Sequence, residues 1–256
     1  MENHVIIVTG GGGGLGSTMT RGLLAAGRRI AAVDIASAGL EALPKSAELC
    51  TLTADIRDPA ECAGVVAAVE ERFGAVHGLI NNAALGPWYT PEGKSPKFYE
   101  LPSERWQRTI DTNVNGTFLM TQAVAPRLVA GGWGRIVNVT TSLGTMTMGG
   151  MAPYGPSKAA IEAVTAVMAT DLQGTGVTAN VLVPGGAADT PMVPQFAAPD
   201  RSKLISPHVM VAPIVWLTSR AADGITARRF IGIHWKSDAS IEENLRAAGA
   251  AVAWPA

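Results

Sequence analysis

The feature that most constrains the fold is a regular alternation of short β-rich runs with longer helical stretches. Runs rich in valine and isoleucine begin near residues 5, 29, 50, 78, 135 and 177. Between them lie Ala- and Leu-rich segments with helical periodicity, of which the clearest are 15–26, 59–73, 103–130 and 153–173. This alternation predicts an α/β fold in which a doubly wound parallel sheet is flanked by helices. Because no internal repeat or long linker interrupts it, we expect residues 1–256 to form a single domain.

The composition favours a globular protein that acts on a small molecule. A hydrophobic content of 47% can build a substantial core, and a net charge of −1 without charge runs disfavours nucleic acid or an anionic membrane as partner. Neither Cys50 nor Cys62 has a neighbour at metal-site spacing, so we expect no metal and a reducing, cytoplasmic location. The opening "MENHVIIVTG" leaves no room for a leader, and no apolar run approaches the roughly 18 residues of a membrane span.

A glycine-rich stretch, "TGGGGGLG", follows the first predicted strand and precedes the first predicted helix. Glycine lets backbone N–H groups approach a pyrophosphate, and the N-terminus of a helix favours the phosphate charge. The run satisfies T-G-x-x-x-G-x-G through Gly10, Gly14 and Gly16, and it also satisfies the looser G-x-G-x-x-G. Its position between a strand and a helix predicts a dinucleotide site rather than a merely flexible turn.

Two acidic residues at strand ends bear on the choice of dinucleotide. Asp34 ends the second predicted strand, where its carboxylate can accept hydrogen bonds from ribose hydroxyls and would repel a 2′-phosphate. No basic residue interrupts the glycine run or directly follows Asp34, so NAD is favoured over NADP. Asp55 ends the third predicted strand, where it either contacts the adenine edge or starts a turn. The alternative for Asp34 is a helix cap or a turn.

The stretch "NVTTSLGTMTMGGMAPYGPSK" combines a tyrosine, a lysine and three hydroxyl residues. Tyr154 and Lys158 are four positions apart and are therefore neighbours on one face of a helix. A free tyrosine has a pKa of about 10, and lowering it by ~3 units, worth ~4 kcal/mol, needs a positive charge such as that of Lys158. From the residues alone, an ordinary aromatic and a solvated lysine would be the simpler interpretation.

Taken together, these motifs resemble those of the short-chain dehydrogenase/reductase family, from Val5 to about Ile231. Five agree in order with the family, namely "TGGGGGLG", Asp34, "NNAA" (81–84), Tyr154-x-x-x-Lys158 and "PGGAADTPM" (184–192). The resemblance implies a Rossmann-type single domain and an NAD(P)-dependent alcohol dehydrogenase or carbonyl reductase. Without that resemblance, the paired asparagines Asn81 and Asn82 would indicate only a turn at the end of a strand.

The resemblance also implies roles for individual residues. Tyr154 would move the proton with the help of Lys158, while Asn113 would accommodate a water linked to Lys158, with Asn115 as its competitor. Family positions expected to contact the cofactor are Gly10, Gly14, Leu15, Gly16, Asp34, Asp55, Ile56, Asn82, Ala83, Tyr154, Lys158, Pro184, Gly185 and Thr190. The position of Thr190 departs from the pattern, because four residues separate it from Gly185 where three are usual.

The family serine that binds the substrate oxygen has no unambiguous counterpart. Family spacing, counted forward from Asn138 or back from Tyr154, lands on Thr141, whereas Ser142 carries the familiar side chain one residue late. Successive side chains of an extended segment point to opposite faces, so both face Tyr154 only if the chain turns between them. We favour Thr141, whose hydroxyl offers the same donor and acceptor, over Ser142 and then Thr140.

Substrate specificity is left open by segments that differ from the family. The predicted loops 85–104 and 185–210 are long and contain several prolines and aromatic residues, and the tail 232–256 lacks the usual glycine pair. Long loops at the carboxyl edge of such sheets commonly bind ligands. Residues that could line an apolar cleft are Trp88, Tyr89, Phe98, Tyr99, Met148, Met151, Met192 and Phe196, each of which could equally be packing.

The sequence therefore predicts an NAD-dependent oxidoreductase that acts on a secondary alcohol or ketone. One alternative is a non-catalytic NAD(P)-binding regulatory module, which the intact tyrosine and lysine disfavour. Another is a sugar-nucleotide epimerase or dehydratase, for which 256 residues leave little room. The resemblance further implies a homo-oligomer, a tetramer or dimer, whose subunits pair through the helices that hold Asn113 and Tyr154.

Overall fold

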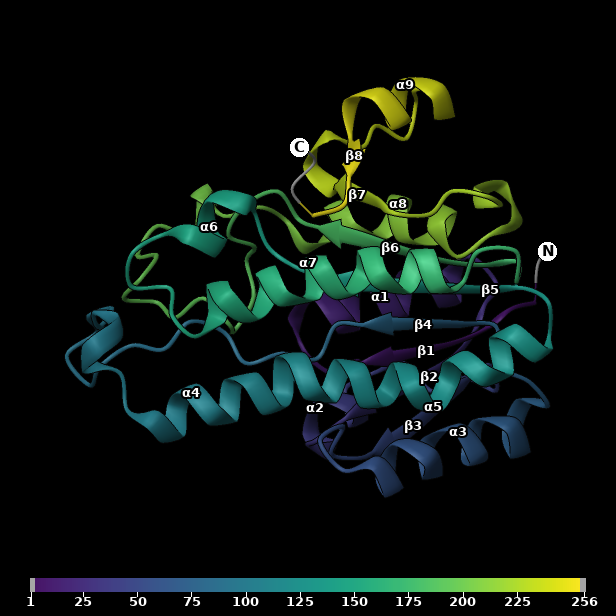
Figure 1. The fold of residues 1–256 in the computed structure, drawn as a ribbon, viewed down its shortest axis with the longest axis horizontal. Helices are drawn as coiled ribbons and strands as arrows, with labels where there is room; N and C mark the ends of the chain where they lie inside the picture. Colours follow the sequence, from purple (N-terminus) through teal and green to yellow (C-terminus); the bar gives the residue numbers. More distant parts are fainter. Residues whose placement is uncertain (1–2, 254–256) are drawn as a thin grey trace.

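The computed structural model describes residues 3–253, which form an eight-stranded sheet between two layers of helices (Figure 1). The strand order is β3-β2-β1-β4-β5-β6-β7-β8, and every neighbouring pair is parallel except β7 and β8. The Rossmann-type fold class is confirmed. The strands are β1 (Val5–Thr9), β2 (Arg29–Asp34), β3 (Leu49–Thr53), β4 (Gly78–Asn81), β5 (Gly134–Val139), β6 (Val177–Val183), β7 (Arg228–Ile231) and β8 (Gly249–Ala251).

The helices follow the predicted alternation, with short additions near the C-terminal end of the chain. The predicted segment 103–130 contains two α-helices joined by a π-helical turn, and helices α8 and α9 follow later. The α-helices are α1 (Gly14–Ala25), α2 (Ser37–Glu41), α3 (Pro59–Phe73), α4 (Ser103–Ile110), α5 (Gly116–Ala130), α6 (Leu143–Thr147), α7 (Tyr154–Asp171), α8 (Val211–Leu217) and α9 (Ile241–Ala247), and the π-helix is η2 (Asp111–Asn115). None in the described chain is long and apolar enough to cross a bilayer.

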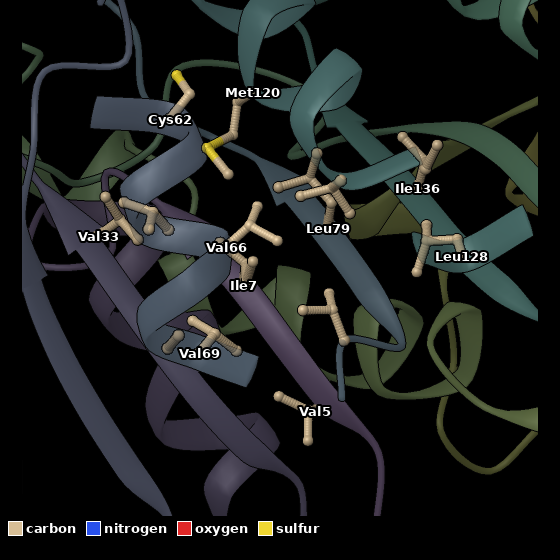
Figure 2. Close-up of a cluster of buried hydrophobic side chains, with 14 of the residues drawn as sticks. Val5, Ile7, Val33, Cys62, Val66, Val69, Leu79, Met120, Leu128 and Ile136 are labelled. Carbon is tan, nitrogen blue, oxygen red and sulfur yellow. The ribbon is translucent and has the colours of Figure 1, made fainter. Parts of the chain in front are cut away.

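Apolar side chains on both faces of the sheet explain why the strands are nearly continuous hydrophobic runs. On one face, Val66 of α3 and Met120 of α5 pack against β-strand residues such as Ile7 and Leu79, all of them buried (Figure 2). On the other face, Met19 and Leu23 of α1 pack with Ile214 of α8. The two buried layers fix the sheet and therefore the positions of its strand ends.

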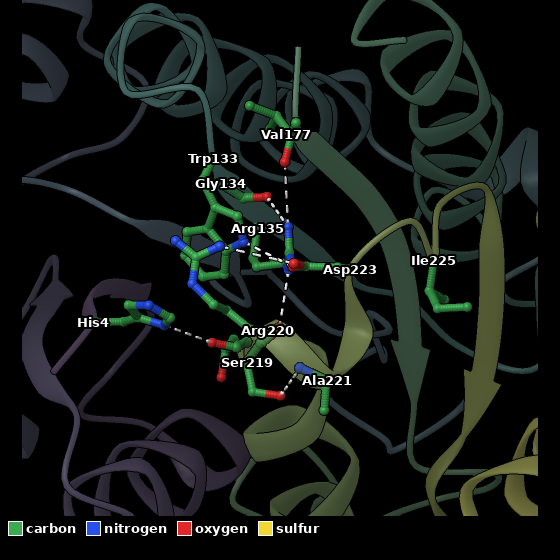
Figure 3. A network of polar contacts seen from close by, with 12 residues as sticks. His4, Trp133, Gly134, Arg135, Val177, Ser219, Arg220, Ala221, Asp223 and Ile225 are labelled. Carbon is green, nitrogen blue, oxygen red and sulfur yellow. Dashed lines mark hydrogen bonds and ion pairs between the residues drawn. The ribbon is translucent and has the colours of Figure 1, made fainter. Parts of the chain in front are cut away.

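A buried arginine stabilises the edge of the sheet where the parallel strands begin. Arg135 of β5 is 1% exposed, forms an ion pair with Asp223 and lies over the ring of Trp133 at 4.2 Å from the centroid (Figure 3). The Trp133 indole N–H also donates to Asp223 at 2.9 Å. This network joins β5 to the segment after α8, at the end of the sheet opposite the glycine turn.

The segment after Ile231 folds back onto the edge of the sheet. It contains α9, which begins with a capping box between Ser240 and Glu243, and β8, which pairs antiparallel with β7. The sequence predicts this tail only as atypical, whereas the structure places it beside β7.

Candidate active site

A cleft with a cavity volume of about 750 Å³ lies at the carboxyl edge of the parallel strands. It is bounded by the glycine turn after β1, the ends of β2 to β6 and the start of α7. Figure 1 shows the arrows of β4 and β6 pointing to the side of the molecule where α6 and the long loops lie. Residues of both long loops line this cleft, among them Tyr89 and Met192, and Tyr89 also contacts Phe196 of the second loop edge to face with ring centroids 5.2 Å apart.

The glycine turn is tight and needs glycine for two different reasons. Gly10 has a φ of +62°, in the left-handed region where a side chain is strained, and a Cβ on Gly16 would lie 1.9 Å from the Gly10 carbonyl oxygen. The Asn82 side chain holds the turn from β4, because its Nδ2 donates to the carbonyls of Thr9 and Gly10 at 3.0 and 3.1 Å. Asn82 thus joins the ends of the neighbouring strands β1 and β4.

Asp34, the last residue of β2, and Asp55, which follows β3, both line the cleft. The Gly12 N–H donates to Oδ2 of Asp34 at 3.1 Å, so this carboxylate lies against the glycine turn. The side chain of Arg57, a lining residue that the sequence analysis missed, donates through Nε to Oδ1 of Asp55 at 2.9 Å. That hydrogen bond is the main reason why the pKa of Asp55 is lowered.

Tyr154 and Lys158 begin helix α7 and are both buried at 8% and 5% exposure. The Lys158 ammonium lies 6.0 Å from the Tyr154 ring centroid and donates to the Val139 carbonyl at 2.8 Å. Burial lowers the pKa of Lys158 to about 8. Burial also raises the pKa of Tyr154, while a side-chain hydrogen bond with Thr141 acts in the opposite direction.

The three hydroxyl residues after β5 have three different partners. Thr141 lines the cleft beside Tyr154 and acts to lower the pKa of its phenol, whereas the Thr140 hydroxyl donates to Glu162 at 2.7 Å. Ser142 caps α6, accepting from the Thr145 N–H at 3.3 Å, and its Oγ lies 2.6 Å from the Thr145 hydroxyl. Thr141 is therefore the one of the three that this geometry directs toward Tyr154.

Asn113 lies in the π-helical turn between α4 and α5 and is 1% exposed. Its Nδ2 donates to the Leu85 carbonyl and to the Ser157 hydroxyl, and its Oδ1 accepts from the Leu85 N–H at 2.8 Å. π-helical turns are frequent at functional sites. Its competitor Asn115 is exposed and bonds Asp111, so Asn113 is the asparagine that contacts the elements of the cleft.

The loop after β6 lies on the other side of the cleft. Thr190 lines the cleft and packs against Gly14, where an added Cβ would lie 2.5 Å from the Thr190 Cβ, so the extra residue still leaves Thr190 beside the glycine turn. Pro184 also lines the cleft. Gly185 has a φ of +105° and lies against Ile231 and Ile233, so it shapes the turn without lining the cavity.

Some of the other predicted site residues line the cleft, and others support the glycine turn or lie away from the cavity. Leu15, Ile56 and Ala83 line the cleft, and Gly16 supports the turn. Of the aromatic and methionine candidates, those that line it are Tyr89, Met148, Met151 and Met192; Trp88, Phe98, Tyr99 and Phe196 do not. Leu85, Pro87 and Leu204 complete the apolar part without a sequence signal that marks them. Across residues 3–253, no group of three His, Cys, Asp or Glu side chains could hold a metal ion.

The sheet, the glycine turn and the cleft at the strand ends define the class of Rossmann-type nucleotide-binding proteins. A model of the short chain dehydrogenase family matches residues 4–200. The chain belongs to this family of nicotinamide-dependent oxidoreductases.

Individual relatives cover most of the chain. A "short-chain type dehydrogenase/reductase" of Picea abies is 32% identical over 73% of this chain and 72% of its own. A "2,5-dichloro-2,5-cyclohexadiene-1,4-diol dehydrogenase" of Sphingobium indicum is 31% identical over 88% of this chain and 94% of its own. Among solved structures, a 3-ketoacyl-(acyl-carrier-protein) reductase from Brucella melitensis complexed with NADH has a TM-score of 0.78 at 26% identity, over 88% of this chain and 94% of that one.

Proposed function

We propose that this protein is an NAD-dependent oxidoreductase that interconverts a secondary alcohol and a ketone. The observation that carries this proposal is the position of Thr141, Tyr154 and Lys158 together in a cleft that continues to the glycine turn. A bound nicotinamide cofactor would accept or donate the hydride. The chain itself has to bind the cofactor, orient the substrate and move one proton.

Tyr154 is the group that we assign to the proton transfer. Its hydroxyl would take the proton of an alcohol or return it to a ketone oxygen, which is general acid–base catalysis. Burial alone makes its ionisation harder, so the positive charge of Lys158 on the next turn of α7 is needed to favour the phenolate. Thr141 would hydrogen-bond the reacting oxygen beside Tyr154, and Asn113 would support a water connected to Lys158.

The residues of the cleft fit a dinucleotide. The tight turn at Gly10, Gly14 and Leu15 would bind the pyrophosphate at the start of α1. Asp55 and Ile56 would border the adenine, and Asp34 would accept hydrogen bonds from the hydroxyls of its ribose. The remaining family positions, Asn82, Ala83, Pro184, Gly185 and Thr190, would surround or support the nicotinamide half, and Lys158 would also hold the ribose hydroxyls there.

We infer a preference for NAD over NADP from the charges around Asp34. A 2′-phosphate at this position would meet the Asp34 carboxylate, which already faces the glycine turn through Gly12. Arg57 lines the same cleft, but its guanidinium is engaged by Asp55. Binding a 2′-phosphate there would therefore require Arg57 to leave Asp55.

The substrate half of the cleft supports an apolar substrate. Tyr89, Met148, Met151, Met192 and Leu204 line it from the two long loops and the α6–α7 connection. Flexible methionines adapt to irregular apolar shapes, so we propose a carbon skeleton with one oxygen directed at Tyr154. The names of two relatives, the diol dehydrogenase of Sphingobium indicum and a levodione reductase of Leifsonia aquatica, are compatible with this class of substrate.

The test is incubation with NAD⁺ and a panel of apolar and polar secondary alcohols, followed by absorbance at the reduced-nicotinamide band. We expect turnover with apolar members of the panel and weaker turnover with polar ones. Saturable NAD⁺ binding without turnover on any alcohol, and without NADH oxidation by the corresponding ketones, would instead support a non-catalytic binding module.

A further inference from the structure

Glu162 of α7 and Arg229 of β7 form a buried ion pair close to the cleft. The Arg229 Nε donates to Glu162 Oε1 at 3.1 Å, and the two side chains are 5% and 0% exposed. Removing two charges from water is costly unless further hydrogen bonds satisfy them. The remaining partners of this pair therefore show what it holds in place.

The Glu162 carboxylate joins the end of β5 to the C-terminal tail. Its Oε1 accepts from the Thr140 hydroxyl at 2.7 Å, and its Oε2 accepts from the Ala253 N–H at 3.1 Å. Ala253 follows β8, which pairs with the strand that carries Arg229. The tail thus contacts a carboxylate that also binds the residue before Thr141.

The Arg229 guanidinium reaches Thr141 itself. Its Nη2 donates to the Thr141 carbonyl at 2.7 Å. The paired register of β5 with β6 ends at Val139 and Leu182, so Thr141 lies beyond the ladder. Arg229 supplies a backbone contact there that the sheet no longer provides.

Each residue of the segment 139–141 is consequently held by a different side chain. Lys158 binds the Val139 carbonyl, Glu162 binds the Thr140 hydroxyl, and Arg229 binds the Thr141 carbonyl. Lys158 and Glu162 are four residues apart, as are Tyr154 and Lys158, so all three lie along one face of α7. The ion pair thereby fixes the backbone of Thr141 relative to the helix that carries Tyr154.

We infer that Glu162 and Arg229 are positioning residues, which hold Thr141 so that its hydroxyl faces Tyr154. This inference rests on the proposed function, because it concerns the residue that we assign to the reacting oxygen. Neither residue of the pair lines the cleft, so we expect the pair to act on the reaction only through Thr141. Small misplacements of a group beside the reacting atoms cost on the order of 10²-fold in rate, so its loss should lower kcat rather than weaken cofactor binding.

The test uses a double variant, Glu162→Leu with Arg229→Met, which removes both charges and leaves neither one buried alone. We expect kcat to fall by about 10-fold to 10²-fold, with an unchanged Kd for NADH by fluorescence titration. Adding Thr141→Val should lower kcat no further than Thr141→Val does alone, because the pair acts through that hydroxyl. The matched control is Arg135→Met, which removes a buried arginine from the other end of β5 and should leave kcat unchanged.

A second readout does not depend on turnover. NMR of protein labelled at the tyrosine Cζ reports the hydrogen bonding of the three tyrosines, and Tyr154→Phe assigns the signal of Tyr154. We expect Thr141→Val and the double variant to shift this signal in the same direction, and Arg135→Met to leave it in place. If wild-type protein turns over no substrate, the proposed function fails while this readout still tests the positioning.

Two results would overturn the inference. One is a folded double variant with wild-type kcat and an unshifted Tyr154 signal. The other is a triple variant whose loss of kcat equals the product of the separate losses in the double variant and in Thr141→Val. If the double variant does not fold, Arg229→Lys takes its place, because it keeps the charge but cannot reach Glu162 and Thr141 with one planar group. Wild-type kcat and an unshifted signal in that variant would count against the inference equally.

Discussion

The Thr141 hydroxyl lies beside Tyr154 in the cleft, where it acts to lower the pKa of the phenol, and its neighbour Ser142 caps helix α6 instead. Ser142, the N-cap of α6, still has an extended backbone, and successive side chains of an extended segment point to opposite faces. Ser142, which carries the side chain usual in the family, therefore caps a helix. Thr141, which stands at the spacing usual in the family, faces Tyr154. Substituting each residue in turn can therefore show which of the two hydroxyls acts in catalysis.

We predict that Thr141→Val lowers turnover far more than Ser142→Ala. Removal of a single donor to the reacting oxygen costs on the order of 10²–10³-fold in kcat. Loss of the Ser142 cap should instead cost about 1 kcal/mol of stability with kcat nearly unchanged. Steady-state kinetics at saturating cofactor and thermal unfolding of both variants measure the two effects. A collapse of turnover in Ser142→Ala alone would mean that Ser142 moves into the cleft during catalysis.

We predict that NADH binds more tightly than NADPH, because Asp34 opposes a 2′-phosphate beside the glycine turn. Asp34→Ala removes this opposition and should narrow the difference between the two Kd values, measured by fluorescence titration. Asp58→Ala is the control, since Asp58 caps α3 through the Ala60 N–H and does not line the cleft. Equal binding of both cofactors by the wild-type protein would refute the assignment of Asp34.

We predict that Lys158→Met is inactive yet more stable than the wild type at neutral pH. Burial lowers the pKa of Lys158 from 10.5 to about 8, and a shift of that size destabilises the folded state by about 3 kcal/mol at neutral pH. Loss of the hydrogen bond to Val139 offsets part of this gain, which leaves about 1–2 kcal/mol.

The destabilisation caused by burying the Lys158 charge depends on pH. Below pH 8 the lysine is charged in both states, and above pH 10.5 it is neutral in both, so the destabilisation disappears between these values as pH rises. Wild-type stability should therefore rise relative to that of Lys158→Met from pH 8 to 10.5, and it should exceed it by about 1–2 kcal/mol at the upper end, where only the hydrogen bond to Val139 remains. If the difference in the free energy of unfolding between the two proteins stayed constant across this range, Lys158 would not be buried as a charge.

We predict a homo-oligomer, a tetramer or dimer, formed through the helices around the site. Trp106 on α4, Phe118 on α5 and Val167 on α7 are 43%, 50% and 59% exposed. Single-subunit mass by light scattering at micromolar concentration would refute the prediction. Phe118→Glu with Val167→Glu should shift the mass toward the monomer, whereas Ile241→Glu, a similar change on α9, should not.

Much of the fold could be predicted from the sequence because its signals are local. The β-rich runs beginning near residues 5 and 177 became β1 and β6, and the segment 153–173 became α7. Strands β7 and β8 are not among the six predicted runs, and the three residues of β8, "GAA", carry no β-propensity and are placed by pairing with β7.

The site could be predicted only where motif spacing fixes it. The position of Thr141 followed from its distance to Asn138 and Tyr154 along the chain. The partner of Arg229 did not, because a charged residue on a strand does not reveal which distant carboxylate it reaches, and Glu162 lies 67 residues away along the chain. The contact between Arg229 and Thr141 spans 88 residues and arises from the order of β5, β6 and β7 in the sheet.

The central claim is that Tyr154 moves the proton in a nicotinamide-dependent hydride transfer. The most direct measurement compares wild type and Tyr154→Phe with saturating NAD⁺ and the best apolar secondary alcohol, recording reduced nicotinamide and, separately, the Kd for NADH. We predict turnover by the wild type and a loss of at least about 10²–10⁴-fold in Tyr154→Phe with an unchanged Kd. Wild-type turnover in Tyr154→Phe would contradict the claim.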